Sequence, residues 1–489
     1  MPFPTPPEPL FDAAKPFIDG GAPGLPAPLL YDVRAPALRQ RTLNFLAKRL
    51  ADMIFVTGLD QADALARLRW KAVGAPGGLD RAVPAQAEQA ALDAARDAGQ
   101  IGIAVDTETR AVRLDWKNPD GPALHGAAVA PPGYGGIVLG NRTALGFDPT
   151  PIPRRAADTA RAWPLGDAVE PPPAPPAALA AAVEALFASS AGLYGVLIAS
   201  PERVLLERYG TGGAVTRATP SWSMTKAMTA TMIGRMIRLG WLGSLHDAAP
   251  APLWHDPRGA HAAITLDHLL RMRSGLAMPL LGEDGAGGLG FENSAVYQDA
   301  ADACDTAQRT IVATRPGAAY RYINSGLNVL GAIIRDRIER RGLPCHATQY
   351  EMLADAIGMS SFRHSADVAG NLIASGSGAA CLRDYAKLGV LYLQDGRWGA
   401  EQFLPPGYAA YALSPSQPGN AYGACFRSNA DRLFASLPPD TAWATGASDQ
   451  RIFILRHAGL VVALTNETDH PVDLGRLEAV LALACEAYE

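Results

Sequence analysis

The stretch PSWSMTKAMTATMIGRMIRLG, residues 220–240, places a serine and a lysine three residues apart at the start of an otherwise apolar segment. Residues three apart share one face of a helix, so the amine of Lys226 can reach the hydroxyl of Ser223. A serine hydroxyl is a weak nucleophile until a neighbouring base accepts its proton. We expect burial and the positive end of the helix dipole to lower the pKa of the Lys226 amine, which favours the neutral form that can act as this base. The pair therefore predicts nucleophilic catalysis.

The same stretch predicts a buried helix that carries the serine in its first turn. Ser221 follows a proline and is a good N-cap, and Gly240 is a good stop after Leu239. Methionines recur every four residues from Met224 to Met236, and few polar residues interrupt the remaining surface. Backbone N–H groups in a first turn have no partner within the helix, so they can stabilise an oxyanion.

A serine and a lysine at this spacing are weak evidence by themselves. With serine at roughly one residue in twenty, six lysines give about 0.3 such pairs by chance. The alternative is that the two residues merely begin a helix and the lysine extends into solvent. Two further stretches decide between these interpretations: YRYINSGLNVLG, which contains Tyr322 and Asn324, and TAWATGASDQRIFILR, in which Thr445 and Gly446 precede a predicted strand.

The order SxxK, YxN and a TG-bearing strand resembles the serine beta-lactamase and penicillin-binding protein family. The likeness is greatest to its class C-like esterase and 6-aminohexanoate-dimer hydrolase branch. Two flanking stretches agree, ITLDHLLRMRSGL between the first two motifs and ASGSGAACLRDYAKLGVLYLQDGRWGAEQFLPP after the second. The resemblance covers roughly residue 177 to the C-terminus, whereas residues 38–170 match much less clearly.

The resemblance implies a role for each motif residue. Ser223 would be the acylated nucleophile, Lys226 its base, and Tyr322 the relay that passes a proton to the leaving group. The substrate would contact Asn324, Trp222 and Gly446, and the oxyanion would bind the backbone N–H groups of Ser223 and Ala447. For Trp222 and Trp443, which flank two of the motifs, lining the pocket and packing in the core are equally good interpretations.

One position departs from the family pattern. The third motif often begins with a lysine or histidine that helps to bind a penicillin carboxylate, but Ala444 stands there. A lost charge-assisted contact is worth roughly 1.5–3 kcal/mol. We therefore expect short uncharged esters or amides to be better substrates than beta-lactams, unless an arginine from elsewhere, such as Arg427, supplies the cation.

The expected function is a serine hydrolase that cleaves small ester or amide substrates through an acyl-enzyme, without a cofactor. Two alternatives remain open: beta-lactamase or D-amino-acid peptidase activity, and a non-catalytic penicillin-binding-like protein that binds a ligand. The chain has no GxSxG motif and no HExxH motif, and the histidines of HDPRGAH (residues 255–261) lie in a loop-like stretch. We expect no metal site.

Composition excludes several classes of protein. Of the 489 residues, 48% are hydrophobic and 19% charged, which is typical of a globular protein. The formal net charge is −5 with no basic stripe, so nucleic acid and anionic membranes are not expected partners. The N-terminal stretch lacks the pattern of a secretion signal, and the five scattered cysteines indicate reduced, mostly buried thiols. We expect a cytoplasmic protein, and a homodimer is compatible with the sequence.

The motif residues Ser223, Lys226 and Tyr322 must be brought together by the fold, which we expect to be a mixed fold of the α/β (α+β) class. GVLIAS and RVLLERYG after residue 190, and RIFILR and GLVVALTN near the C-terminus, predict strands of one antiparallel sheet, and the segments between them are mostly helical. The expected division is an extended arm (1–37), an accessory α/β domain (38–150), a proline-rich linker (151–176) and a beta-lactamase-like hydrolase domain (177–489) with a helical insertion at about 265–365.

Overall fold

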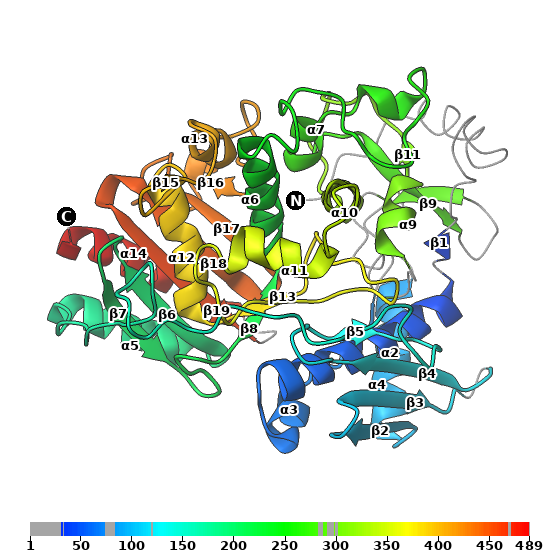
Figure 1. Ribbon diagram of the computed structural model, residues 1–489. Coiled ribbons are helices and arrows are strands. Elements are labelled where there is room, and N and C mark those ends of the chain that lie inside the picture. The colour runs from blue at the N-terminus through cyan, green and yellow to red at the C-terminus, as the bar shows by residue number, and fades with distance from the viewer. Residues whose placement is uncertain are drawn as a thin grey trace.

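The computed structural model describes residues 31–32, 34–73, 84–118, 121–281, 287–290, 298, 302–467 and 471–488. Most of the predicted N-terminal arm lies outside the described residues. Figure 1 shows a smaller front lobe, which contains α2 to α4 and β2 to β5, beside a larger body that contains all later elements. Within the described residues, no helix combines the length and apolar character needed to cross a membrane.

The body is built on a six-stranded antiparallel sheet in the order β16-β17-β18-β19-β6-β7. Every residue of β6, β18 and β19 is buried, because helices cover both faces of the sheet. Strands from the two ends of the hydrolase region pair as the sequence predicts. The strands are β6 (Leu193–Ala199), β7 (Val204–Tyr209), β16 (Arg427–Ser428), β17 (Ala442–Gly446), β18 (Gln450–Leu455) and β19 (Leu460–Asn466).

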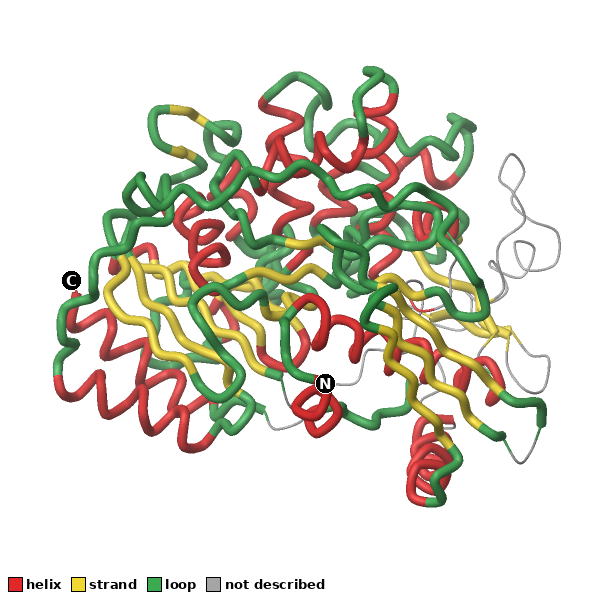
Figure 2. Tube along the Cα trace, turned by 60° about the horizontal axis from the view of Figure 1, so that its bottom comes forward, coloured by secondary structure: helices red, strands yellow, loops and turns green. Residues whose placement is uncertain are grey.

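Two layers of helices enclose this sheet. On one face α5 (Ala177–Ser189) and α14 (Leu474–Tyr488) pack against each other over a separate apolar cluster. On the other face lie α12 (Leu382–Leu393) and α6 (Thr225–Arg238), which belong to the largest core. Figure 2 shows the strands between these helical layers.

Short helices and strands form the region between the first and last strands of the sheet. Its helices are α7 (Leu266–Leu270), α9 (Ala303–Gln308), α10 (Asn324–Glu339), α11 (Cys345–Gln349), the π-helical turn Tyr350–Ala354 and α13 (Tyr408–Leu413). Its strands are β8 (Thr219–Trp222), β9 (Leu276–Leu281), β10 (Gly287–Gly290), β11 (Ile311–Val312), β12 (Arg363–His364), β13 (Gly378–Ala380), β14 (Arg397–Trp398) and β15 (Glu401–Gln402). The mostly helical insertion predicted at about 265–365 is therefore interrupted by short strands, because this region also forms small sheets of its own.

The front lobe is a four-stranded antiparallel sheet with a long helix packed across it. Glycine is required at Gly126 on β4, because a Cβ there would lie 2.4 Å from the carbonyl carbon of Leu43 on α2. The first two strands of this sheet, β2 and β3, form an antiparallel hairpin in which Asp106 pairs with Ala111. The elements of this lobe are α2 (Ala35–Ala51), a π-helical turn (Asp52–Val56), α3 (Gln61–Arg67), α4 (Pro84–Asp97), β2 (Ile101–Asp106), β3 (Ala111–Trp116), β4 (Leu124–Val129) and β5 (Ile137–Val138). The short strand β1 (Tyr31–Asp32), which precedes α2, pairs with β9 of the body.

The proline-rich segment 151–176 contains no helix, and it lies against the body. Arg154 forms an ion pair of 2.7 Å with Asp355, and its guanidinium lies 3.8 Å from the ring centroid of Tyr350. Farther along, Asp167 accepts a 2.6 Å hydrogen bond from the fully buried Lys387. These contacts hold the segment in place, although its role as a domain boundary stays a prediction.

Candidate active site

Ser223 lies in the short connection between a strand and a helix. The prediction that Ser221 caps the helix is wrong, because Ser221 is part of β8, and α6 begins only at Thr225. Ser223 therefore precedes the helix, and Lys226 lies in its first turn. The predicted stop at Gly240 is confirmed, with φ of 70° just after the last turn.

The hydroxyl of Ser221 binds β13 instead of capping α6. It donates to the carbonyl oxygen of Gly378 at 2.8 Å and lies 2.7 Å from the hydroxyl of Thr225. The Thr225 hydroxyl in turn accepts a 2.9 Å hydrogen bond from the Gly378 N–H. These contacts anchor the strand before the nucleophile and the first helical turn after it to the same residue.

Strained backbone surrounds Ser223. Trp222, directly before it, has φ of 47°, and Ser448 and Asp449 after β17 have φ of 59° and 61°. Residues other than glycine seldom adopt such angles, and when they do the surrounding fold enforces them, often at functional sites. The strain therefore falls on the two segments that flank the candidate site.

Two of the predicted side chains converge on the hydroxyl oxygen of the third, Ser223. The Lys226 Nζ lies 2.8 Å from the Ser223 Oγ, and the Tyr322 hydroxyl lies 2.8 Å from the same atom. Lys226 is only 1% exposed, and its Nζ also donates to the carbonyl oxygen of Ser375 at 2.5 Å. The alternative in which the lysine extends into solvent is therefore wrong.

The groups behind this centre are held in their neutral forms by burial. Burial raises the pKa of the Cys425 thiol to about 12, although the charge of Lys226 acts in the opposite direction. Burial likewise raises the pKa of Tyr422 well above its usual value, and its ring makes an edge contact with Tyr322 at a centroid distance of 6.2 Å. No negative charge forms at these two groups near neutral pH.

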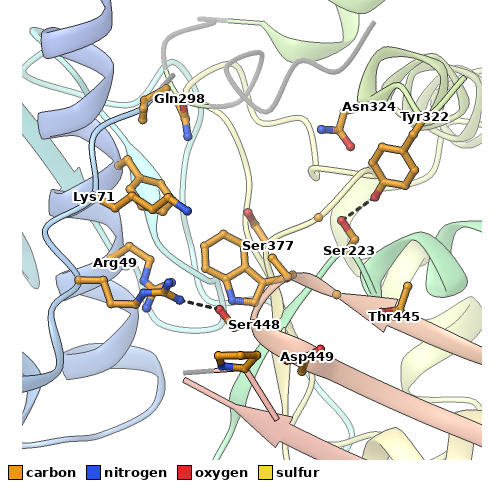
Figure 3. A pocket seen from close by; sticks show the side chains of 18 of the residues that line it. Arg49, Lys71, Ser223, Gln298, Tyr322, Asn324, Ser377, Thr445, Ser448 and Asp449 are labelled. Carbon is orange, nitrogen blue, oxygen red and sulfur yellow. Dashed lines mark hydrogen bonds between the residues drawn. The ribbon is translucent and has the colours of Figure 1, made fainter. Parts of the chain in front are cut away.

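A cavity of about 760 Å³ opens above Ser223, and the predicted site residues line it. Trp222, Ser223, Tyr322, Asn324, Thr445, Gly446 and Ala447 all contribute to its wall. Figure 3 shows Ser223 and Tyr322 facing each other, with Asn324 near Tyr322 and Thr445 below. A pocket of this size suits a small organic molecule.

Three residues considered from sequence do not line the cavity. Ala444 is fully buried within the core. Trp443 is also fully buried and packs on the rings of two phenylalanines, so the core interpretation holds for it. Arg427 forms a 2.6 Å ion pair with Asp431 and is not the cation of the cavity.

The sequence interpretation missed most of the opposite wall. From the front lobe come Phe45, Arg49, Arg69, Lys71, Ala72 and Val73, and from the body come Gln298, Gly376, Ser377, Ser448, Asp449 and Pro471. Gly376 and Ser377 lie in the quoted ASGSG stretch, and Ser448 and Asp449 lie in the quoted TAWATGASDQRIFILR stretch, but none of the four was predicted as a site residue. The front-lobe residues lie in none of the motifs found in the sequence, so their contribution to the cavity could not be predicted.

The described residues contain no group of three or more His, Cys, Asp or Glu side chains placed to hold a metal ion. Within the HDPRGAH stretch, the buried His261 forms a 2.8 Å hydrogen bond with the Thr310 carbonyl oxygen.

The fold around this site, an antiparallel sheet between helical layers with a largely helical region inserted, is beta-lactamase-like. The Beta-lactamase family model matches residues 179–485. The chain therefore belongs to the beta-lactamase family, and its relatives in fold include hydrolases. No curated relative matches the chain.

Several solved structures are similar in fold at low sequence identity. One is a Bacillus anthracis protein proposed to be a 6-aminohexanoate-dimer hydrolase (18% identity, TM-score 0.50, 62% of this chain and 80% of that one). A penicillin-binding protein homologue from Caulobacter crescentus has 18% identity and a TM-score of 0.48, over 65% of this chain and 99% of that one. EstCE1, a hydrolase with promiscuous acyltransferase activity, has 18% identity and a TM-score of 0.47, over 64% and 98%. At this identity the likeness concerns the fold.

Proposed function

We propose that the protein is a serine hydrolase that cleaves small ester or amide bonds through an acyl-enzyme. The observation that carries this proposal is the position of the Ser223 Oγ, which lies 2.8 Å from both the Lys226 Nζ and the Tyr322 hydroxyl at the edge of a cavity. A nucleophile within hydrogen-bond reach of a base and a proton relay is the arrangement that acyl transfer requires.

In the first half-reaction the Ser223 Oγ attacks the substrate carbonyl carbon, and its proton passes to the neutral Lys226 amine. The negative charge that forms on the carbonyl oxygen would be stabilised by the N–H groups of Ser223 and Ala447. Removal of one such donor typically costs about 2.7–4 kcal/mol of transition-state stabilisation. Tyr322 delivers a proton to the leaving oxygen or nitrogen as its bond to the carbonyl carbon breaks. The protonated Lys226 then returns its proton to Tyr322, so that both groups begin the second half-reaction in their neutral forms.

In the second half-reaction water attacks the acyl carbon and gives its proton to the same base. The bond between the carbonyl carbon and the Ser223 Oγ breaks, the serine regains its proton, and the carboxylic acid product leaves. Asn324, Trp222 and Gly446, which line the cavity, are proposed to contact the substrate.

The test is covalent labelling. We expect a fluorophosphonate to add one adduct per chain by intact-mass spectrometry, and we expect the Ser223→Ala variant to lose the adduct together with nearly all turnover of p-nitrophenyl butyrate. The melting temperature should change little, because only one small hydroxyl is removed. The matched control is Ser448→Ala, a second serine of the cavity whose hydroxyl contacts Arg69.

Ser448→Ala should still label. Stoichiometric labelling of Ser223→Ala would contradict the assignment of the nucleophile. A wild-type protein that neither labels nor hydrolyses any ester or amide would instead support the non-catalytic, ligand-binding alternative.

A further inference from the structure

One wall of the cavity belongs to the front lobe and carries its positive charges. Helix α2 contributes Arg49, and the segment after α3 contributes Arg69 and Lys71. Figure 3 shows Arg49 and Lys71 on the side of the cavity opposite Ser223. The wall is fixed to the body, since the Arg69 Nη1 donates to the Ser448 Oγ at 3.0 Å.

Two of the charged groups that line the cavity, Arg49 and Asp449, have partners of opposite charge within the protein. Arg49 forms an ion pair with the buried Glu467, and its guanidinium lies 4.8 Å from the ring centroid of Trp222. Asp449, the only carboxylate among the described lining residues, accepts a 2.7 Å hydrogen bond from Arg451. Neither group needs a ligand to balance its charge.

The other two charged residues of this wall, Arg69 and Lys71, are both positive. Burial lowers the pKa of Arg49 to about 10, and the neighbouring charge of Arg69 acts in the same direction, so two like charges interact at this wall. Lys71 is exposed and forms no ion pair with any residue that the structure describes. A ligand anion placed here would be attracted by the positive charges of Lys71 and Arg69.

We propose that the substrate is an ester or amide that carries a carboxylate, and that Lys71, together with Arg69, holds this carboxylate. The inference rests on the proposed function and specifies its substrate class. The side chains of Phe45, Val73 and Trp222 give the cavity an apolar stretch as well. This combination suits one carboxylate on an apolar chain better than a multiply charged phosphate.

The assignment also explains how the site can lack a cation in its third motif. Ala444 offers no charge, and the cationic groups come instead from a lobe outside the matched residues 179–485. Arg69 and Lys71 would therefore be specificity-determining residues that the hydrolase domain does not contain.

The experiment compares release of p-nitrophenol from two substrates, the mono-p-nitrophenyl ester of suberic acid and its methyl ester, in which a methyl group removes the charge of the carboxylate. For the wild-type protein we expect kcat/KM to be at least about tenfold higher for the free acid, as a charge-assisted contact implies. The Lys71→Gln and Arg69→Gln variants should each reduce this ratio, and Lys71→Glu should invert it. The ratio is the readout because a general loss of activity affects both substrates equally.

Lys117→Gln is the matched control, because it removes an exposed lysine of the front lobe that does not line the cavity. It should leave the ratio unchanged. High salt should lower the wild-type ratio, since an exposed charge pair is screened.

Hydrolysis of both esters at equal rates, or a ratio insensitive to Lys71→Glu, would overturn the inference and leave the proposed function standing. Hydrolysis of neither ester, without labelling of Ser223, would overturn both.

Discussion

The Lys226 side chain lies beneath the nucleophile, with its Nζ between the Ser223 hydroxyl and the carbonyl oxygen of Ser375. An arginine could occupy a similar space and keep the positive charge, but a guanidinium does not give up its proton in proteins. We therefore expect Lys226→Arg to be nearly as inactive as Lys226→Ala in hydrolysis of p-nitrophenyl butyrate. Substantial turnover by the arginine variant would exclude lysine as the base.

The same argument gives the direction of the pH dependence. Only the neutral amine accepts a proton from Ser223, so kcat/KM should be low while Lys226 is protonated and should rise as pH increases through the neutral to mildly alkaline range. Tyr322→Phe should retain this rise while reducing the rate, on the order of the 10²–10⁴-fold typical of a lost proton-transfer partner. A flat profile for the wild-type protein would contradict a titrating base.

At the scale of elements, the small sheet β12-β13-β8 connects the nucleophile to a buried histidine. His364 on β12 forms a 2.9 Å hydrogen bond with the Ile373 carbonyl oxygen, and burial lowers its pKa from 6.5 to about 4. Because the folded protein resists protonation of this ring, its contribution to stability is complete above pH 6.5 and decreases as the pH falls towards 4.

We expect the wild-type protein to lose up to about 3 kcal/mol of unfolding free energy from this group between pH 6.5 and 4. His364→Gln, which keeps a hydrogen-bond donor but cannot be protonated, should lose less over the same interval. Denaturant unfolding at a series of pH values measures the difference. Identical pH dependence for the two proteins would show that another group dominates.

Several elements were predictable because their evidence is local. The strands β6, β7, β18 and β19 are short apolar runs bounded by turns, and α5 is an alanine- and leucine-rich helix, so their types follow from sequence. The start of α6 was not predictable in this way. Ser221 has the side chain of an N-cap, but its hydroxyl binds Gly378, which is 157 residues away in the chain. Local pattern carries no information about such a partner.

The candidate site likewise contains residues that local sequence motifs predicted and residues that they could not predict. Ser223, Lys226 and Tyr322 lie in motifs, and the structure brings them together. Arg69 and Lys71 lie in no motif, and only the docking of the front lobe brings them to the cavity. From the sequence we noted that Ala444 lacks the family's cation and named Arg427 as an arginine from elsewhere that could replace it, but Arg427 pairs with Asp431 outside the cavity.

At the scale of the whole molecule, the buried pair of Arg49 and Glu467 joins the front lobe to the end of β19. Removal of one partner leaves the other charge buried without compensation, which typically costs about 3–5 kcal/mol. We expect Glu467→Gln to destabilise the protein by an amount of this order. The double variant Arg49→Met/Glu467→Gln should be more stable than Glu467→Gln alone, because it no longer buries an uncompensated guanidinium.

Differential scanning calorimetry and denaturant unfolding of the wild-type protein, Arg49→Met, Glu467→Gln and the double variant give the coupling between the two residues. If the effects of the two substitutions simply add, the pair does not contribute to holding the lobes together.

The composite cavity has a consequence for the protein while it is being made. The ribosome releases the front lobe first, whereas β17, the residues after it that carry Ser448, and Glu467 emerge near the end of synthesis. Contacts between segments so distant in sequence form late, since the intervening chain must fold before they can close. A nascent chain can therefore already display Ser223 and Lys226 and still lack both the strand that borders them and the wall that selects a substrate. Hydrolytic competence and selectivity arise together, only when the last strands are in place.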